Sequence, residues 1–242
     1  MILNRSNFKR AYVWQLPVRF FHWLNALSIT VLCITGFIIA DPPALLSSAD
    51  ATEIYRFGIV RFIHFVAAYT FVIMILMRFY WAFVGNRYAR WSAYWPFTQK
   101  ALKNIFHVFK VDILLLNEKN RDLRNISVGH NTVAAMAYIA FFILFLIMIF
   151  TGFGLYSSMT TAWFPKLFSW VVPLLGGDFA ARLVHHTVMW PIILIVIIHV
   201  YLVLYHDWLE GRGEVSSMVS GYKFVVTDRF PKEEIEIIEE KK

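Results

Sequence analysis

The residues with the most chemistry to offer are eight histidines, at positions 22, 64, 107, 130, 185, 186, 199 and 206. Four of them lie within long apolar stretches: His22, His64, His185 and His199. Ionisable side chains in such stretches are costly and usually functional. A single one is more often a hydrogen-bonding residue between helices. Paired imidazoles from facing helices, however, can hold a haem iron in the core of a bundle.

The spacing between His185 and His199 places both on one face of a helix. They are 14 residues apart, which comes within ~40° of a whole number of turns and spans ~21 Å along the axis. His186 is 13 residues from His199 and would point ~140° away from it. We therefore expect His185 and His199 to be ligands at two depths, with His186 taking no part.

The stretches that carry these histidines are long enough to cross a membrane. Of 242 residues, 59% are hydrophobic and 16% charged, and the mean hydropathy is +0.57; soluble domains average about 25% charged residues. Composition thus excludes a soluble enzyme, a disordered chain and a disulfide scaffold. Since ~20 helical residues cross the hydrocarbon core, the sequence predicts spans at residues 20–40, 62–84, 131–153 and 183–205. The expected fold is an all-α integral membrane protein, a four-helix bundle forming a single domain over residues 1–242.

The distribution of positive charge predicts the direction of the spans. The N-terminal arm, the connection 85–130 and the tail from residue 207 together hold 18 Lys and Arg side chains, whereas the other two connections hold 4. By the positive-inside rule, both termini and the middle connection lie in the cytoplasm, and residues 207–242 form a charged cytoplasmic tail. The net charge of +7 is thereby explained without a nucleic-acid partner.

This orientation sorts the four histidines into two levels. His64 and His185 fall near the outer ends of their spans, and His22 and His199 fall nearer the cytoplasm. We therefore predict two haem b groups with bis-histidine ligation, the outer one held by His64 and His185 and the inner one by His22 and His199. The single cysteine, Cys33, excludes a cysteine-ligated iron–sulfur cluster, a Cys-type zinc site and a covalently attached c-type haem.

A glycine and three arginines fit the same prediction. Gly36 follows His22 by 14 residues, which puts it at the outer level, where a glycine lets a flat macrocycle approach the backbone. Each of Arg19, Arg61 and Arg182 precedes a histidine by three residues, and cations one turn nearer the surface suit haem propionates. Two plainer interpretations stay open: Gly36 as a small packing residue, and the arginines as side chains that snorkel to the interface.

Two further segments are expected to lie on the membrane rather than cross it. Residues 98–116 alternate apolar side chains with lysines, which is typical of an amphipathic helix on the cytoplasmic leaflet. Residues 163–175 are apolar but broken by Pro165 and Pro173. They are predicted to lie at the outer interface without making a fifth crossing.

Several stretches are distinctive enough to place the chain: PVRFFHWLN (17–25), TGF (35–37), RFIHF (61–65), MRFYWAFVGNRYAR (77–90), VGHNTVAAMAY (128–138), TGFGLYS (151–157), HHTVMW (185–190), HVY (199–201) and MVSGY (218–222). With them the chain resembles the b-type cytochrome subunit of membrane-bound nickel–iron hydrogenases. That family lies within a wider group of four-helix dihaem cytochromes that includes the gamma subunit of formate dehydrogenase. The order of YWAFVGNRY and GHN is specific to the hydrogenase branch. The family's haem ligands correspond here to His22, His64, His185 and His199.

The resemblance implies an electron-transfer subunit of a hydrogen:quinone oxidoreductase in the bacterial cytoplasmic (inner) membrane. Hydrogen is oxidised on a separate large subunit, and electrons leave it through the iron–sulfur clusters of a small subunit. They are expected to enter this chain at the outer haem, cross to the inner one and reduce menaquinone or ubiquinone. The outer connections, residues 41–60 and 155–182, are the expected contact with the small subunit.

The start of the third span is the expected quinone site. His130 and Asn131 fall at the inner level, where they could hydrogen-bond a quinone carbonyl, and the wider family uses the same helix end. The plain alternative is that Asn131 caps the helix. Two other functions stay open: a cytochrome serving formate dehydrogenase or thiosulfate reductase, and a haem-free membrane anchor or transporter that uses the histidines as a proton path.

Overall fold

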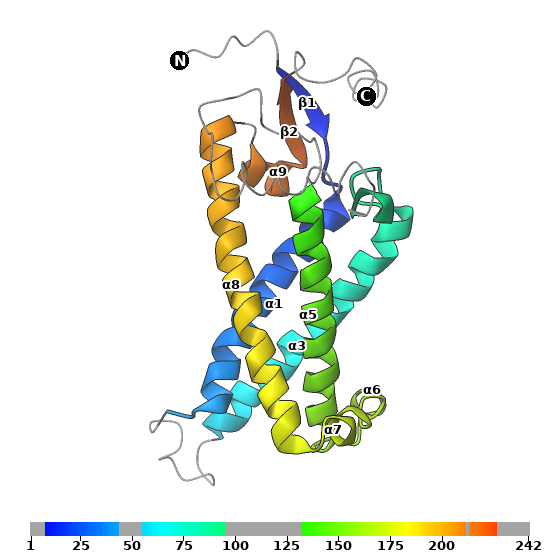
Figure 1. Ribbon diagram of the computed structural model, residues 1–242, viewed down its shortest axis with the longest axis vertical. Coiled ribbons are helices and arrows are strands. Elements are labelled where there is room, and N and C mark those ends of the chain that lie inside the picture. Colours follow the sequence, from blue (N-terminus) through cyan, green and yellow to red (C-terminus); the bar gives the residue numbers. More distant parts are fainter. Residues whose placement is uncertain (1–7, 44–54, 95–131, 212, 227–242) are drawn as a thin grey trace. The chain divides into compact units, whose positions relative to one another are not determined.

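The computed structural model describes residues 8–43, 55–94, 132–211 and 213–226. The described part is mostly helical and contains four long helices, labelled in Figure 1: α1 (Leu16–Ala40), α3 (Arg56–Val84), α5 (Thr132–Ser157) and α8 (Asp178–Glu210).

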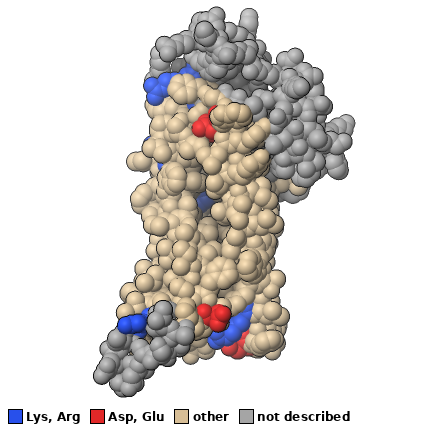
Figure 2. Space-filling view, turned by 90° about the vertical axis from the view of Figure 1, so that its left-hand side faces the viewer, with Lys and Arg blue, Asp and Glu red and all other residues tan. Residues whose placement is uncertain are grey.

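The four predicted spans are confirmed as helices that are long and apolar enough to cross a membrane. Each has 25 to 33 residues, which at ~1.5 Å per residue exceeds the ~30 Å of a hydrocarbon core. Large apolar side chains such as Leu194 and Ile197 are exposed on them. Figure 2 shows how little charge interrupts the described surface on the face that it draws. Such a surface suits lipid rather than water.

The chain divides into two compact units, to both of which every long helix contributes residues. The first unit comprises residues 1–19, 82–146 and 190–242, and the second comprises residues 20–81 and 147–189.

The first unit contains a small sheet that the all-helical prediction missed. Strand β1 (Phe8–Tyr12) pairs antiparallel with β2 (Tyr222–Val226), from Phe8 opposite Val226 to Tyr12 opposite Tyr222. Helix α9 (Glu214–Ser220) precedes β2. Residues 207–242, predicted as a charged cytoplasmic tail, therefore also contain α9 and β2 in their first part. Five-residue strands become stable through their partner, which here lies more than 200 residues away in the sequence.

Gly221, between α9 and β2, contacts the segment before α1. Its carbonyl accepts hydrogen bonds from the backbone N–H groups of Val13 (2.9 Å) and Trp14 (3.1 Å). Its φ is +88°, and a Cβ there would lie 2.7 Å from the carbonyl oxygen of Trp14. Both the left-handed backbone and the close approach require glycine. The indole N–H of Trp14 also donates to Ser217 Oγ at 3.2 Å.

Asn86, in the VGNRY stretch just after α3, contacts the same segment before α1. Its side-chain amide donates to the carbonyl of Val13 (2.9 Å), and its backbone N–H donates to Gln15 Oε1 (2.9 Å). Its side-chain oxygen accepts from the backbone N–H of Ala89 (3.0 Å). This branch-specific asparagine thus has a structural task within the first unit.

In the second unit, aromatic side chains pack helices far apart in the sequence. Phe65 of α3 stacks on Tyr156 of α5 with ring centroids 3.9 Å apart. Tyr69 meets Phe153 edge to face at 5.1 Å. Phe153 in turn contacts Phe164 of α6 at 5.0 Å. These pairs hold α3 and α5 together and place α6 against them.

The segment 163–175 forms no fifth long helix. It folds into two single turns, α6 (Trp163–Lys166) and α7 (Val171–Leu174), which contain Pro165 and Pro173. Trp163 and Leu174 are exposed, whereas Pro165 and Val171 are buried. The other predicted interfacial segment, residues 98–116, lies outside the described residues.

We expect Asn86→Ala to lower the free energy of unfolding of the first unit by about 2 kcal/mol, because two side-chain hydrogen bonds are lost and the Val13 carbonyl loses its donor. Thermal unfolding of the purified protein in detergent measures the change. Ser216→Ala, which removes an exposed hydroxyl from the same unit, is the matched control. Equal melting temperatures for the two variants would contradict the role given to Asn86.

Candidate functional site

The four candidate histidines lie on three of the long helices. His22 lies on α1, His64 on α3, and both His185 and His199 on α8. The first three belong to the second unit and His199 belongs to the first. The structure therefore describes the surroundings of His64 and His185 within one unit, and both histidine pairings stay predictions.

His64 is held on one edge by two consecutive residues of α1. Its Nδ1 lies 2.8 Å from the hydroxyl oxygen of Thr35. A Cβ on Gly36 would lie 3.7 Å from its Cε1 atom, at ordinary contact distance. Gly36 therefore lies at the level of His64, and in this structure its contact is with the imidazole.

His185 is held in the same way by two consecutive residues of α5. Its Nδ1 lies 2.8 Å from the hydroxyl oxygen of Thr151. A Cβ on Gly152 would approach its Cε1 to 3.1 Å, which is tighter than ordinary contact. Only a glycine lets the imidazole lie where it does without displacement.

The same short sequence thus forms both contacts. Thr35 and Gly36 begin one Thr-Gly-Phe triplet, and Thr151 and Gly152 begin another. Three of these residues were not predicted as site residues: Thr35, Thr151 and Gly152. The repeated triplet was the available signal, but only Gly36 stands at a 14-residue interval from a histidine of its own helix, His22; α5 contains no histidine.

Both imidazoles belong to the second unit. His185 is half-buried, and the neighbouring His186 is exposed. The described residues contain no group of three or more His, Cys, Asp or Glu side chains that could hold a metal ion. Two imidazoles without further ligands fit a metal whose remaining ligands come from a macrocycle, as in a haem.

Each of the three predicted propionate partners has a protein contact. Arg19 donates to the carbonyl of Val219. Arg61 donates to the sulfur of Met159. Arg182 pairs with Asp178 one turn earlier at 2.7 Å, with both side chains about half exposed. None of these contacts excludes an additional anion, so a role toward haem propionates stays a prediction.

A buried arginine lies on α3 as well. Arg78 is 8% exposed, and its guanidinium carbon lies 5.7 Å from the ring centroid of Phe21 on α1. It follows His64 by 14 residues, the interval that also separates His185 from His199. It is the one Asp, Glu, Lys or Arg side chain within the predicted span 62–84. Its burial makes it a structural cation of the second unit.

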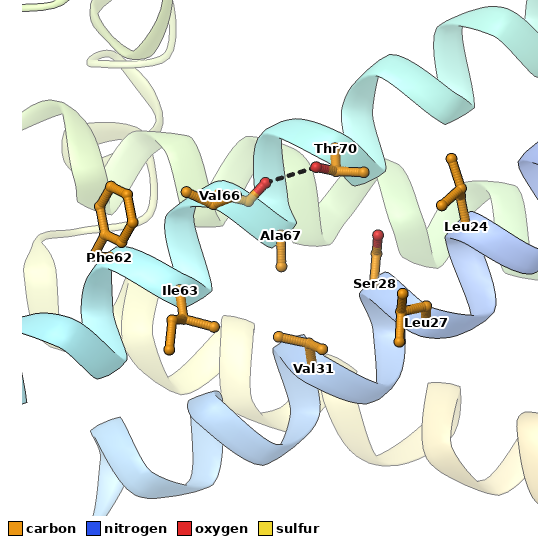
Figure 3. Close-up of a pocket in the computed structure, with 9 residues that line it drawn as sticks. All are labelled: Leu24, Leu27, Ser28, Val31, Phe62, Ile63, Val66, Ala67 and Thr70. Carbon is orange, nitrogen blue, oxygen red and sulfur yellow. Dashed lines mark hydrogen bonds between the residues drawn. The ribbon is translucent and has the colours of Figure 1, made fainter.

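An open apolar groove of about 250 Å³ runs between α1 and α3 in the same unit. Figure 3 shows its lining, in which the only side-chain hydroxyls are those of Ser28 and Thr70. Thr70 donates to the carbonyl of Val66 at 2.9 Å. No histidine lines this groove, so it is separate from the imidazole contacts. Its lining suits an acyl chain better than a polar ligand.

Two predicted site residues lie outside the described residues. These are His130 and Asn131, the proposed quinone contacts.

Comparison with known proteins finds a matching family and several similar proteins. The family described as prokaryotic cytochrome b561 matches residues 13–221. A probable Ni/Fe-hydrogenase B-type cytochrome subunit from Cupriavidus necator is 38% identical over 226 residues, 92% of this chain and 90% of that protein. The protein of the same name from Azotobacter vinelandii is 36% identical, with 90% of each chain covered. A probable Ni/Fe-hydrogenase 1 B-type cytochrome subunit from Escherichia coli K12 is 35% identical, covering 88% and 90%.

The two glycines should respond differently to an added methyl group. We expect Gly152→Ala to cost about 1–3 kcal/mol, because its Cβ must displace the His185 ring from 3.1 Å. Gly36→Ala has 3.7 Å to His64 and should be neutral or slightly stabilising, since Ala favours a helix by ~1 kcal/mol. Thermal unfolding in detergent measures both. A Gly36→Ala protein that melts as low as Gly152→Ala would contradict this reading.

Proposed function

Because the chain belongs to the prokaryotic cytochrome b561 family, we propose that it is the haem-carrying membrane subunit of a nickel–iron hydrogenase and passes electrons from that enzyme to a quinone. It is a multi-pass bacterial membrane protein, and a b-type cytochrome carries haem b. The names of its relatives associate them with Ni/Fe-hydrogenase. The two haems, their ligands and the quinone are the proposal.

The observation that carries the proposal is the pair of imidazoles in the second unit. His64 and His185 come from different helices, and each is held along its Nδ1–Cε1 edge by a threonine and a glycine of a further helix. A histidine that only joins two helices needs no such glycine. Imidazoles that would hold a haem iron need to be oriented by such neighbouring groups.

His64 and His185 would hold the outer haem, and His22 and His199 the inner one. Haem b supplies an iron that gains and loses one electron. The protein orients the imidazoles, keeps the surroundings apolar and supplies cations for the propionates, for which Arg19, Arg61 and Arg182 are the candidates. The inner pair is supported by the 14-residue interval on α8 and by the position of His22 on α1.

The charge distribution supports a direction for the transfer. With 18 Lys and Arg side chains on one side and 4 on the other, both termini are cytoplasmic by the positive-inside rule. Oxidation of one hydrogen molecule on the partner enzyme, outside, releases two protons and two electrons. Reduction of one quinone to the quinol takes up two electrons and two protons, and these protons come from the cytoplasm if the quinone binds at the inner level.

The outer side of the second unit offers a surface for the iron–sulfur subunit. Within the predicted contact region 155–182, large apolar side chains are exposed on or beside α6 and α7: Trp163, Leu167, Trp170, Leu174 and Phe179. Aromatic side chains are enriched both at membrane interfaces and at protein contacts. Docking here would bring the electron donor close to His64 and His185, which belong to the same unit.

Two alternatives are weaker. A subunit of a formate dehydrogenase or thiosulfate reductase would carry the same histidines, but the relatives described above are named for hydrogenase. A haem-free anchor or proton path would need histidines that exchange protons along a chain. The Nδ1 atoms of His64 and His185 instead each meet a threonine hydroxyl.

Histidine substitutions test the haem assignment directly. We expect two haems per chain by pyridine haemochrome assay, loss of one and the same redox component in His64→Ala and His185→Ala, and loss of the other in His22→Ala and His199→Ala. His186→Ala is the matched control, because this neighbouring histidine lies off the face that the 14-residue spacing of His185 and His199 defines, and it should keep both haems. If His64→Ala and His199→Ala removed the same component, the pairing would be wrong. Wild-type protein without haem would refute the proposal as a whole.

The quinone assignment is tested by the kinetics of reoxidation. In the His130→Ala and Asn131→Ala variants, hydrogen-dependent reduction of both haems should stay at the wild-type rate, and reoxidation by added quinone should slow at least several-fold. A capping role predicts instead less folded protein with unchanged turnover per haem. Wild-type reoxidation per haem in both variants would exclude this site and direct attention to Tyr205 and His206 at the end of α8.

A further inference from the structure

We propose that Thr35 and Thr151 are positioning residues that fix the ring protons of His64 and His185 on Nδ1 and thereby present the bare Nε2 atoms to the iron. The inference rests on the proposed function in one respect, that these imidazoles are haem ligands. The position of the ring protons follows from the hydrogen bonds of the two threonines and does not depend on the haem.

The hydroxyl hydrogen of each threonine is already used within its own helix. Thr35 Oγ1 lies 2.7 Å from the carbonyl oxygen of Val31, and Thr151 Oγ1 lies 2.6 Å from that of Ile147. A carbonyl oxygen can only accept, and a hydroxyl has one hydrogen to donate. At 2.6–2.7 Å, two oxygens without a hydrogen between them would repel each other. The hydroxyl therefore donates to the carbonyl.

Toward the imidazole, the same oxygen can then only accept. Nδ1 of His64 and Nδ1 of His185 each lie 2.8 Å from it, so each Nδ1 must carry the hydrogen. A neutral imidazole has one ring proton, and its other nitrogen, Nε2, keeps a free lone pair. That nitrogen is the one able to bind a metal. Histidine ligands generally have their second nitrogen fixed in this way by a hydrogen-bond acceptor.

Other membrane threonines of the chain show that the carbonyl bond alone does not create this arrangement. Thr30 donates to the carbonyl of Ala26 at 2.9 Å on α1, and Thr70 donates to that of Val66 at 2.9 Å on α3, as Figure 3 shows for the latter. For neither does the structure give an imidazole contact. Thr35 and Thr151 differ because a glycine follows each of them and lets a ring approach.

The arrangement has an electronic consequence. An acceptor on the Nδ1–H group raises the electron density on Nε2, makes the imidazole a stronger donor and favours the ferric over the ferrous iron. Because both ligands of the outer haem receive this bond, its midpoint potential is held lower than that of a haem whose ligands lack it. Removing either hydroxyl should raise that potential.

The test is a spectroscopic redox titration of the full-length, haem-loaded protein with Thr35→Val and Thr151→Val. Valine keeps the branched shape and replaces the hydroxyl by a methyl group. We expect an upward shift of the midpoint potential of the same single haem in both variants, with the other haem unchanged. Serine at either position, which keeps the hydroxyl, should restore the wild-type value. Thr30→Val and Thr70→Val are the matched controls and should shift neither haem.

Each outcome has a definite meaning. Two bound haems with unchanged potentials in both valine variants would overturn the role of the threonines and leave the proposed function standing. A shift of different haems by the two variants would overturn it as well. Wild-type protein without haem by the pyridine haemochrome assay would instead refute the proposed function. Should a valine variant lose its haem, the alanine variant, which removes the hydroxyl without placing a methyl group against the ring, is titrated with the same expectation.

Discussion

An imidazole in an apolar interior has two nitrogens to satisfy, and this constraint governs the centre of the second unit. Leaving a ring N–H or a lone pair without a partner in such surroundings costs several kcal/mol. For His64 and His185 the threonine hydroxyls of Thr35 and Thr151 satisfy Nδ1 at 2.8 Å. Each hydroxyl is in turn bonded to the backbone of its own helix. One nitrogen per ring is thereby committed to the protein.

The glycines follow from the same constraint. A hydrogen bond of 2.8 Å between the ring and a short threonine side chain brings the ring against the adjoining turn of the helix, where a side chain would otherwise lie. Gly152 leaves 3.1 Å between its Cβ position and Cε1 of His185, and Gly36 leaves 3.7 Å beside His64. Thr-Gly is therefore a unit: the first residue binds the ring and the second makes room for it. The aromatic packing of Phe65 on Tyr156 holds two of the participating helices in place.

In the first unit, polar groups have a different role, because they hold the segment before α1 in place by hydrogen bonds. Residues 13–15 form hydrogen bonds, through backbone or side chain, with Asn86, Ser217 and Gly221. The buried ammonium group of Lys223 pairs with Glu214 at 2.5 Å and lies over the ring of Trp14. Several motifs by which the chain resembles its family, VGNRY and MVSGY among them, are explained by these contacts rather than by a cofactor.

Helices in a membrane are determined locally, and for this reason the sequence by itself predicted the four spans, the lack of a fifth crossing at residues 163–175, and which histidines lie within the spans. Apolar length and the cost of an ionisable group in hydrocarbon need no knowledge of neighbours. Contacts between distant segments are another matter. Only the tertiary structure brought Thr35 to His64, Thr151 to His185 and β1 to β2. A threonine in a helix ordinarily bonds its own backbone, as Thr30 does, and a five-residue strand is stable only beside its partner. The role of such residues depends on which distant segments pack against them, and a local sequence pattern does not specify those segments.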